Sequence, residues 1–317
     1  MIEQMIELRN DAVLVTVDPG RGADVLTLTE LSTGCDVLFR SPWRLRADAV
    51  RGGQAPSTYH PVAGWLEQYR GGWQTLCPNG GPPREVHGAP VGFHGEASTV
   101  PWTTDRATAE RLELHVELFS VPVRIDRVLE LDGAGVRVTD TLTNGGRGSL
   151  EIDYSSHPAL GGEFLDAECR LECGARRFTA DPDSSATPLE PGSEHVWPRA
   201  VDREGQELDL RVVPAPGATR EIFGWLDDFE EPWAALTNPQ LGLTVRMDWD
   251  GERMPFAWLW QELNATANFP WFGRARAIAV EPATMPTGGP GRRSVLSLLP
   301  EENVSVWVRC GLERKGP

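Results

Sequence analysis

The sequence is short of positive charge. Its 317 residues include 30 Lys and Arg against 46 Asp and Glu, which gives a formal net charge of −16 at pH 7. Nucleic acids and anionic membranes are bound through clustered Lys and Arg side chains, so we expect neither of them as a partner. Multiply charged substrates are disfavoured for the same reason. A neutral ligand suits this composition better.

Long apolar stretches and a cysteine framework are also missing. No segment approaches the roughly 18 apolar residues of a membrane-spanning helix, and residues 1–5 lack the basic start and apolar core of a signal peptide. The five cysteines are scattered and odd in number, which suits reduced thiols, and we expect a cytoplasmic protein. Cys169 and Cys173 share a face if their segment is extended. No second pair follows, so we predict no metal site.

Long, well-capped amphipathic helices are the third absence, and residues 104–112 allow at most a brief helix that strand alternation soon replaces. Turn residues are instead abundant, with 33 Gly and 26 Pro. Between them lie about a dozen segments with period-two alternation, such as residues 112–119, where Leu112, Leu114 and Val116 share one face. This pattern predicts an all-β fold, a large antiparallel β-sandwich with few short helices. We expect residues 1–317 to form a single domain, with 181–198 as a long surface excursion.

Tryptophan is plentiful, with 12 residues. Sugars present apolar C–H faces that stack on aromatic rings, while their hydroxyls bond to polar neighbours. We therefore expect about two or three tryptophans to contact a sugar, and the others to pack in the core. The tryptophans that stand beside polar residues are Trp65, Trp73, Trp102, Trp258, Trp260 and Trp271.

Three polar segments interrupt the strand-like sequence. The first is the glycine-rich stretch 71–81, which leads to Phe93-His94-Gly95; the second is His157-Pro158, and the third is Glu281-Pro282. Glu281 follows an apolar run, and burial would raise the pKa of its carboxyl group toward that of a general base. A carboxylate and an imidazole together can remove one proton and deliver another near neutral pH.

In their order, these motifs resemble the aldose 1-epimerase, or galactose mutarotase-like, superfamily. The resemblance spans roughly residues 60 to 290 and also includes Trp260-Gln261-Glu262, Pro270-Trp271-Phe272-Gly273, and Thr284 after Glu281-Pro282. It implies the large β-sandwich of that superfamily, called a supersandwich. It also implies an isomerase of carbohydrate metabolism that interconverts the α and β anomers of free sugars without a cofactor.

The resemblance also implies roles for individual residues. Glu281 would be the base on the anomeric hydroxyl, His157 the acid on the ring oxygen, and His94 a substrate-binding partner. Many relatives carry an Asn-Arg pair before the His-Gly motif, which this chain lacks, and Gln74 and Arg70 are the nearest substitutes. The residues expected to bind the substrate are His94, Gln74, Asn79, His87, Arg70, Trp260, Gln261 and Asp227.

The substrate class and the competing functions follow from the same residues. Relatives that act on hexose 6-phosphates tend to have an arginine soon after the His-Gly motif, whereas His94-Gly95 precedes Glu96 here. We therefore expect an unphosphorylated monosaccharide, bound by a monomer or a homodimer. A non-catalytic sugar-binding or sugar-sensing protein is one alternative. A carbohydrate lyase or hydrolase is another, with Glu96 or Glu262 as the second carboxylate that hydrolysis normally requires.

Overall fold

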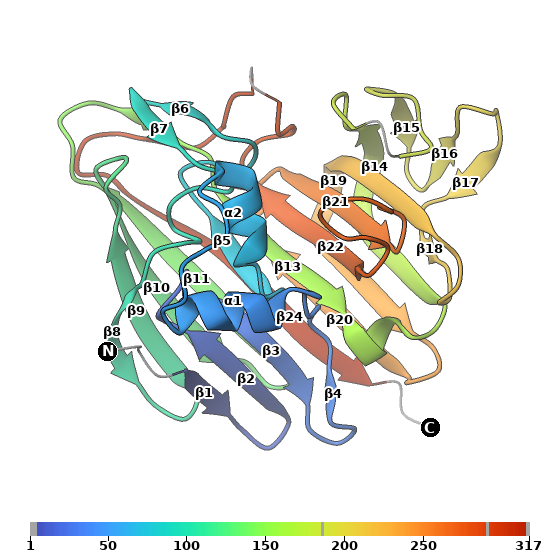
Figure 1. The fold of residues 1–317 in the computed structure, drawn as a ribbon, viewed down its shortest axis with the longest axis horizontal. Helices are drawn as coiled ribbons and strands as arrows, with labels where there is room; N and C mark the ends of the chain where they lie inside the picture. Colours follow the sequence, from blue (N-terminus) through green and yellow to red (C-terminus); the bar gives the residue numbers. More distant parts are fainter. Residues whose placement is uncertain (1–4, 185–186, 290–291, 315–317) are drawn as a thin grey trace.

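Antiparallel strands dominate the computed structural model, which describes residues 5–184, 187–289 and 292–314 (Figure 1). An 18-stranded sheet contains strands from both ends of this range. Its strands are β1 (Ile6–Arg9), β2 (Val13–Asp18), β3 (Asp24–Glu30), β4 (Cys35–Asp36), β5 (Trp73–Leu76), β8 (Thr103–Ala107), β9 (Arg111–Glu117), β10 (Val123–Leu131), β11 (Gly135–Asn144), β13 (Ser155–Gly161), β14 (Cys169–Ala180), β15 (Glu194–Val196), β18 (Val212–Val213), β19 (Arg220–Asn238), β20 (Leu243–Trp249), β21 (Phe256–Leu263), β22 (Arg276–Ala283) and β24 (Asn303–Arg314).

The remaining elements are short. Three two-stranded sheets stand apart from the large one, and two α-helices and one 3-10 helix complete the described residues. The small sheets are β6 (Arg84–Val86) with β7 (Ala89–Val91), β12 (Leu150–Glu151) with β23 (Ser297–Leu298), and β16 (Arg199–Val201) with β17 (Glu207–Asp209). The helices are α1 (Arg44–Arg51), α2 (Pro61–Glu67) and η1 (Gly162–Leu165).

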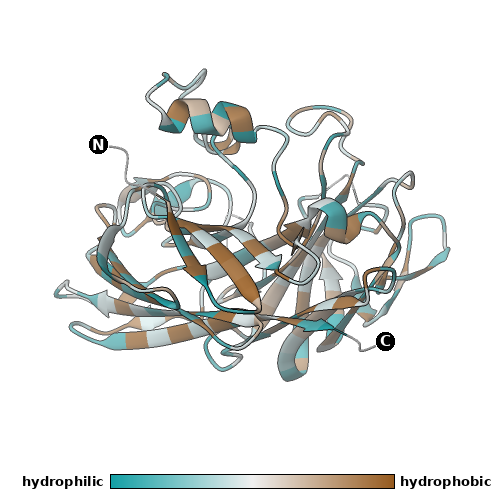
Figure 2. Cartoon of the chain, turned by 90° about the horizontal axis from the view of Figure 1, so that it is seen from below, coloured by the Kyte–Doolittle hydropathy of each residue, from teal (hydrophilic) through white to brown (hydrophobic). Residues whose placement is uncertain are grey.

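The large sheet curves until it almost closes on itself (Figure 2). Its strands pair in the order β8, β9, β10, β11, β24, β20, β19, β21, β22, β13, β5, β3, β2, β1. A backbone hydrogen bond of 2.6 Å from Arg9 N–H to Ala109 C=O then links β1 to the turn between β8 and β9. The result is a sheet curved nearly into a barrel, which confirms the predicted all-β, antiparallel fold class.

The period-two pattern marks the inward face of the strands correctly. In β9, Leu112, Leu114 and Val116 are buried while the residues between them are partly exposed. Figure 2 shows the same alternation as bands of hydrophobic and hydrophilic colour along the strands. Burial of one face of each such strand therefore builds the core, because most of the apolar side chains of the curved sheet point inward.

The brief helix allowed at residues 104–112 does not form. These residues instead form β8, a turn and the start of β9. The helix-favouring residues in this segment are overridden because β8 extends the edge of the sheet by pairing with β9. The expectation of few short helices holds. In α2, Pro61 occupies the first turn and His60 Nδ1 accepts a hydrogen bond from the Ala63 N–H, which together start the helix.

An ion pair is buried inside the sheet. The guanidinium of Arg127 on β10 donates to both carboxylate oxygens of Asp140 on β11, at 2.8 and 2.7 Å, and both side chains are almost completely buried. The hydroxyl of Tyr154 donates to the same carboxylate at 2.8 Å. Interior charges of this kind are tolerated only while each has its partner.

We predict that Arg127→Met lowers the free energy of unfolding by about 3–5 kcal/mol, because it leaves Asp140 charged and unpaired in the core. Urea unfolding at pH 7 measures this loss. The double variant Arg127→Met/Asp140→Asn removes the stranded charge while it keeps an acceptor for Tyr154, so it should regain a large part of the stability. Equal instability of the single and double variants would contradict this explanation.

Candidate active site

One cavity of about 390 Å³ brings the predicted catalytic residues together. It lies where β13, β19, β21 and β22 meet the segment around α2, and aromatic rings form much of its wall. A pocket of this size, apolar with a few polar groups, is typical of small-molecule sites. The lining residues are Trp65, Leu66, Tyr69, Gly81, Pro82, Phe93, His94, His157, Asp181, Asp183, Ser184, Glu221, Phe223, Trp258, Trp260, Pro270, Trp271, Glu281 and Gly288.

His157 and Glu281 face each other across two neighbouring strands. β13 and β22 pair so that Ser155 lies opposite Ala283 and Ala159 opposite Ala279, and the same register places His157 opposite Glu281. Directly opposed residues on one face of a sheet have adjacent side chains. The His157 Nε2 atom lies 3.4 Å from Glu281 Oε1, although the two residues are 124 positions apart in the sequence.

Burial controls the protonation of this pair. Glu281 is 2 % exposed, and loss of hydration raises the pKa of its carboxyl group well above the usual value. The same effect lowers the pKa of the His157 imidazole to about 4. Both shifts favour the neutral forms, so near pH 7 the pair holds one proton, on the carboxyl group or between the two side chains. We therefore describe the contact as a proton-sharing pair rather than a permanent salt bridge.

The other polar atoms of the pair are free to contact a ligand. Neither His157 Nδ1 nor Glu281 Oε2 has a hydrogen-bond partner among the described residues, and both atoms are buried. Buried polar atoms in folded proteins normally have a partner. Two unpaired atoms on adjacent side chains at a cavity wall indicate a place where a polar ligand completes the hydrogen bonding.

His94 approaches the pair from a different part of the chain. Its Nδ1 lies 3.3 Å from the Gly80 carbonyl oxygen, so this nitrogen is the donor and Nε2 is left as an acceptor. Burial, together with the neighbouring His157, lowers the pKa of His94 well below its usual value and keeps it neutral. The two imidazole rings lie 5.9 Å apart.

Aromatic rings enclose these three residues. Trp65 contacts the His94 ring, with a centroid distance of 4.6 Å, and Trp260 lies 5.9 Å from the His157 ring. Trp258 and Trp271 also line the cavity, so four tryptophans face it. Trp73 and Trp102 are buried in the core, as expected of the remainder.

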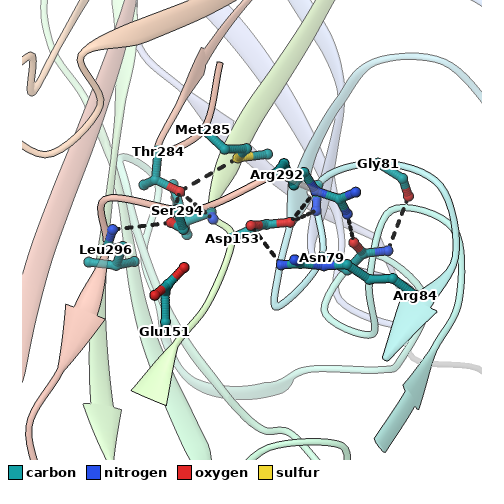
Figure 3. A network of polar contacts seen from close by, with 12 residues as sticks. Asn79, Gly81, Arg84, Glu151, Asp153, Thr284, Met285, Arg292, Ser294 and Leu296 are labelled. Atoms are coloured by element: carbon teal, nitrogen blue, oxygen red, sulfur yellow. Dashed lines mark hydrogen bonds and ion pairs between the residues drawn. The ribbon is translucent and has the colours of Figure 1, made fainter. Parts of the chain in front are cut away.

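Asn79 is close to the cavity but does not line it. Its amide donates hydrogen bonds to the carbonyls of Gly81, Pro82 and Gly92, and its Oδ1 accepts one from Arg292 (Figure 3). Arg292 also binds Asp153 at 2.8 Å and the Gly288 carbonyl at 2.7 Å. Because Gly81 and Gly288 line the cavity, this network shapes the wall, and Asn79 has no free group left for a substrate.

Gln74 and Arg70, the suggested substitutes for the missing Asn-Arg pair, also fall outside the lining. Gln74 lies opposite His157 in the pairing of β5 with β13, but its amide nitrogen donates to Asp24 and to the Gly71 carbonyl behind the cavity. Arg70 is held in ion pairs with Asp18 and Asp48. Both side chains are therefore engaged by other residues and neither lines the cavity.

Three further predicted residues are engaged elsewhere. His87 is exposed, and its Nε2 accepts a hydrogen bond from the Glu151 N–H at 3.1 Å. Gln261 is completely buried and binds Arg220, and Asp227 forms an ion pair with Arg177 at 2.6 Å. Of the predicted site residues, the structure therefore brings together His94, His157, Glu281 and Trp260.

Several cavity residues had not been predicted: Tyr69, Phe93, Asp181, Asp183, Glu221 and Phe223. The segment 181–198, expected to be a surface excursion, begins at the cavity, where the Asp181 N–H donates to the Phe223 carbonyl at 3.0 Å. Glu221 and Phe223 are two residues apart on β19 and so share its cavity face. This segment had not been predicted as a strand, so neither residue was expected at the cavity.

Neither a metal-binding cluster nor a membrane-spanning helix is found among the described residues. Among the residues that the structure describes, no group of three or more His, Cys, Asp and Glu side chains is placed to hold a metal ion. No helix in this part of the chain is long and apolar enough to cross a membrane.

Comparison with known proteins identifies the fold. A family model described as a domain of unknown function (DUF4432) matches residues 3–301. A galactose mutarotase-like protein from Lactobacillus casei ATCC 334 superimposes with a TM-score of 0.66 and 15 % identity, over 98 % of this chain and 100 % of that one. A galactose mutarotase-like protein from Clostridium acetobutylicum superimposes with a TM-score of 0.67 and 16 % identity, over 98 % of this chain and 95 % of that one.

A third solved structure, the Slr1438 protein from Synechocystis sp. PCC 6803, has a TM-score of 0.69 and 19 % identity, over 98 % of this chain and 96 % of that one. No curated protein sequence matches the chain. At these identities the structural similarity shows the fold alone. The protein therefore has the galactose mutarotase-like fold that the sequence motifs predicted.

The position of His94 depends on the glycine that follows it. Gly95 has a φ of +77°, and a Cβ atom there would lie 2.4 Å from the Cys77 carbonyl oxygen. Gly88, in the similar His87-Gly88 pair, has a φ of +85° but open space around it. We predict that Gly88→Ala costs about 1–2 kcal/mol of stability, from backbone strain alone.

Gly95→Ala should cost clearly more, because the clash with backbone adds to the strain and displaces His94. Chemical unfolding of both variants measures the difference, and Gly88→Ala is the matched control. Equal losses in the two variants would show that close packing does not hold the His94 loop.

Proposed function

We propose that this chain, which belongs to the DUF4432 family, is an aldose 1-epimerase that interconverts the anomers of a free, unphosphorylated monosaccharide without a cofactor. One observation carries the proposal: the buried Glu281–His157 pair, with a free polar atom on each side chain, at the wall of an aromatic cavity. Interconversion of anomers neither consumes nor releases a proton overall. A pair that holds one exchangeable proton therefore has what the reaction needs.

Ring opening removes a proton from the anomeric hydroxyl and adds one to the ring oxygen. Glu281 accepts the proton from O1, and the electrons of that bond form the C1=O1 double bond. The C1–O5 bond breaks, its electrons stay on O5, and His157 supplies the proton to that oxygen. Rotation about C1–C2 and closure by the reverse steps invert the anomer. In the reactive form of the pair, the shared proton is on His157 and Glu281 is ionised. This form differs from the neutral pair only because the proton has moved from Glu281 to His157.

The cavity lining supports a neutral sugar. Among the described lining residues there is no Lys or Arg that would bind a phosphate. Trp65, Trp260 and Trp271 offer ring faces for the apolar side of a sugar, and Asp181 and Glu221 offer acceptors for its hydroxyls.

The glycosidase alternative receives less support. The second carboxylates considered for it, Glu96 and Glu262, do not line the cavity. Glu96 accepts hydrogen bonds from the backbone N–H groups of Phe119 and Ser120, and Glu262 accepts them from Ala265 and Thr266. Both carboxylates therefore serve to fix turns.

We predict that the protein accelerates the equilibration of freshly dissolved α-glucose or α-galactose, followed by polarimetry. Glu281→Gln and His157→Ala should each lower kcat by about 10²–10⁴-fold, because each removes one of the two proton-transfer groups. Binding, followed by tryptophan fluorescence, should survive in Glu281→Gln. Sugar binding by the wild type without acceleration across a panel of aldoses would instead favour the sensing protein.

The pKa shifts predict a pH dependence with a defined sign. As the pH falls through about 4, His157 takes up a second proton for the pair, no base remains, and kcat/KM should fall. The effect on stability has two parts of opposite sign. The unfolded chain binds a proton at His157 from about pH 6.5 downward while the folded protein resists it until about pH 4, so His157 by itself lowers the free energy of unfolding as the pH falls between these values. The raised pKa of Glu281 offsets this loss, because the folded protein keeps a proton there that the unfolded chain has released.

His157→Gln removes the contribution of His157 and leaves that of Glu281, so the variant should gain stability relative to the wild type as the pH falls from 7 to 4. Denaturant unfolding of both proteins at several pH values between 4 and 7 measures the two slopes. Parallel curves for the wild type and the variant would show that His157 does not resist protonation in the folded protein.

A further inference from the structure

Tyr69 is a cavity residue that the proposed reaction has not used. It follows α2, and its ring is held by other aromatic rings on several sides. It stacks on Trp65, with centroids 4.9 Å apart and an interplanar angle of 21°. Its ring also meets His157 at 6.2 Å and Trp271 at 6.3 Å in edge contacts. The position of the ring is therefore fixed before any ligand arrives.

The hydroxyl group of Tyr69 is buried but unpaired. The residue is 3 % exposed, and its hydroxyl has no hydrogen-bond partner among the described residues. A buried tyrosine hydroxyl normally finds a partner. Tyr154 is the internal comparison: it is equally buried, and its hydroxyl donates to Asp140 at 2.8 Å. Of these two tyrosines, only Tyr69 lines the cavity.

Its electrical surroundings keep Tyr69 protonated. Burial raises the pKa of the hydroxyl well above the usual value of 10.0, and negative charge at Glu281 and Asp24 raises it further. The group is therefore an O–H donor at any physiological pH. Because the Tyr69 ring lies 6.2 Å from the His157 ring and both residues line the cavity, Tyr69 stands in the same part of the cavity as the proton-sharing pair.

We propose that Tyr69 is a further catalytic residue, whose hydroxyl donates a hydrogen bond to a reacting oxygen of the sugar beside Glu281 and His157. The role rests on the proposed function. Negative charge develops on the sugar oxygens as a proton leaves O1 and the C1–O5 bond breaks. A fixed, desolvated donor stabilises such charge more than it stabilises the ground state. The described lining supplies no Lys or Arg for this purpose.

Tyr69→Phe tests the proposal, with Tyr154→Phe as the matched control. Tyr69→Phe keeps the ring contacts and removes only an unpaired hydroxyl, so its melting temperature should equal or exceed that of the wild type. Its kcat should fall by about 10²-fold, the usual effect of losing one such donor, with a smaller change in KM. Tyr154→Phe should melt a few degrees lower and keep its kcat, because its hydroxyl serves only the core.

A kcat for Tyr69→Phe within about threefold of the wild type would overturn the proposal, since a reacting oxygen would then not need this donor. A melting temperature lowered as in Tyr154→Phe would also count against it, because the hydroxyl would then serve the fold.

The sugar contact can be measured apart from turnover. In the Glu281→Gln background, adding Tyr69→Phe should weaken sugar binding, measured by tryptophan fluorescence, by several-fold. Unchanged binding and unchanged kcat together would remove Tyr69 from the site. If the wild type binds a sugar but epimerises no aldose, the proposed function fails, while weaker binding by Tyr69→Phe still supports the contact of Tyr69 with the sugar.

Discussion

The pairing of β13 with β22 is the constraint on which the site depends. It places an imidazole opposite a carboxyl group on two strands that are almost completely buried. A carboxylate in that position would be costly without a partner, and so would an imidazolium. Each group therefore makes the other tolerable, because together they need hold only one proton. A shift of one residue in the register would turn one of the two side chains to the opposite face.

The loops around the pair are fixed by a polar network that does not itself face the cavity. Arg292, with a completely buried side chain, connects Asp153 to Asn79 and to the Gly288 carbonyl (Figure 3). Asn79 in turn holds the carbonyls of Gly81 and Gly92, on either side of the approach to His94. The backbone of these glycine-rich turns forms part of the cavity wall. The buried Arg292–Asp153 pair, which holds these turns, therefore helps to set the shape of the cavity. The described lining itself is uncharged or acidic.

Sequence periodicity predicted the fold well because alternation reports directly which face of a strand is buried. It allowed a brief helix at residues 104–112, where strand pairing outweighs the local helix preference. In the site, His94, His157 and Glu281 were predicted because their motifs are local. Asn79 was misassigned because its partner, Arg292, lies 213 positions later. Tyr69 was missed because nothing near it in the sequence indicates that its ring packs against His157 and Trp271, which are distant in the chain.

The unpaired polar atoms give a physical reason for regarding the cavity as functional. Three of them, on Tyr69, His157 and Glu281, belong to side chains that line one wall. Two more, on Gln74 and Asp24, lie directly behind it, and burial raises the pKa of Asp24 to about 7. Each such atom lowers the stability of the ligand-free fold. A purely structural core would be more stable with apolar side chains at these positions, so the three unpaired atoms on the cavity lining are understandable if a polyhydroxylated ligand completes the hydrogen bonds that the protein leaves open.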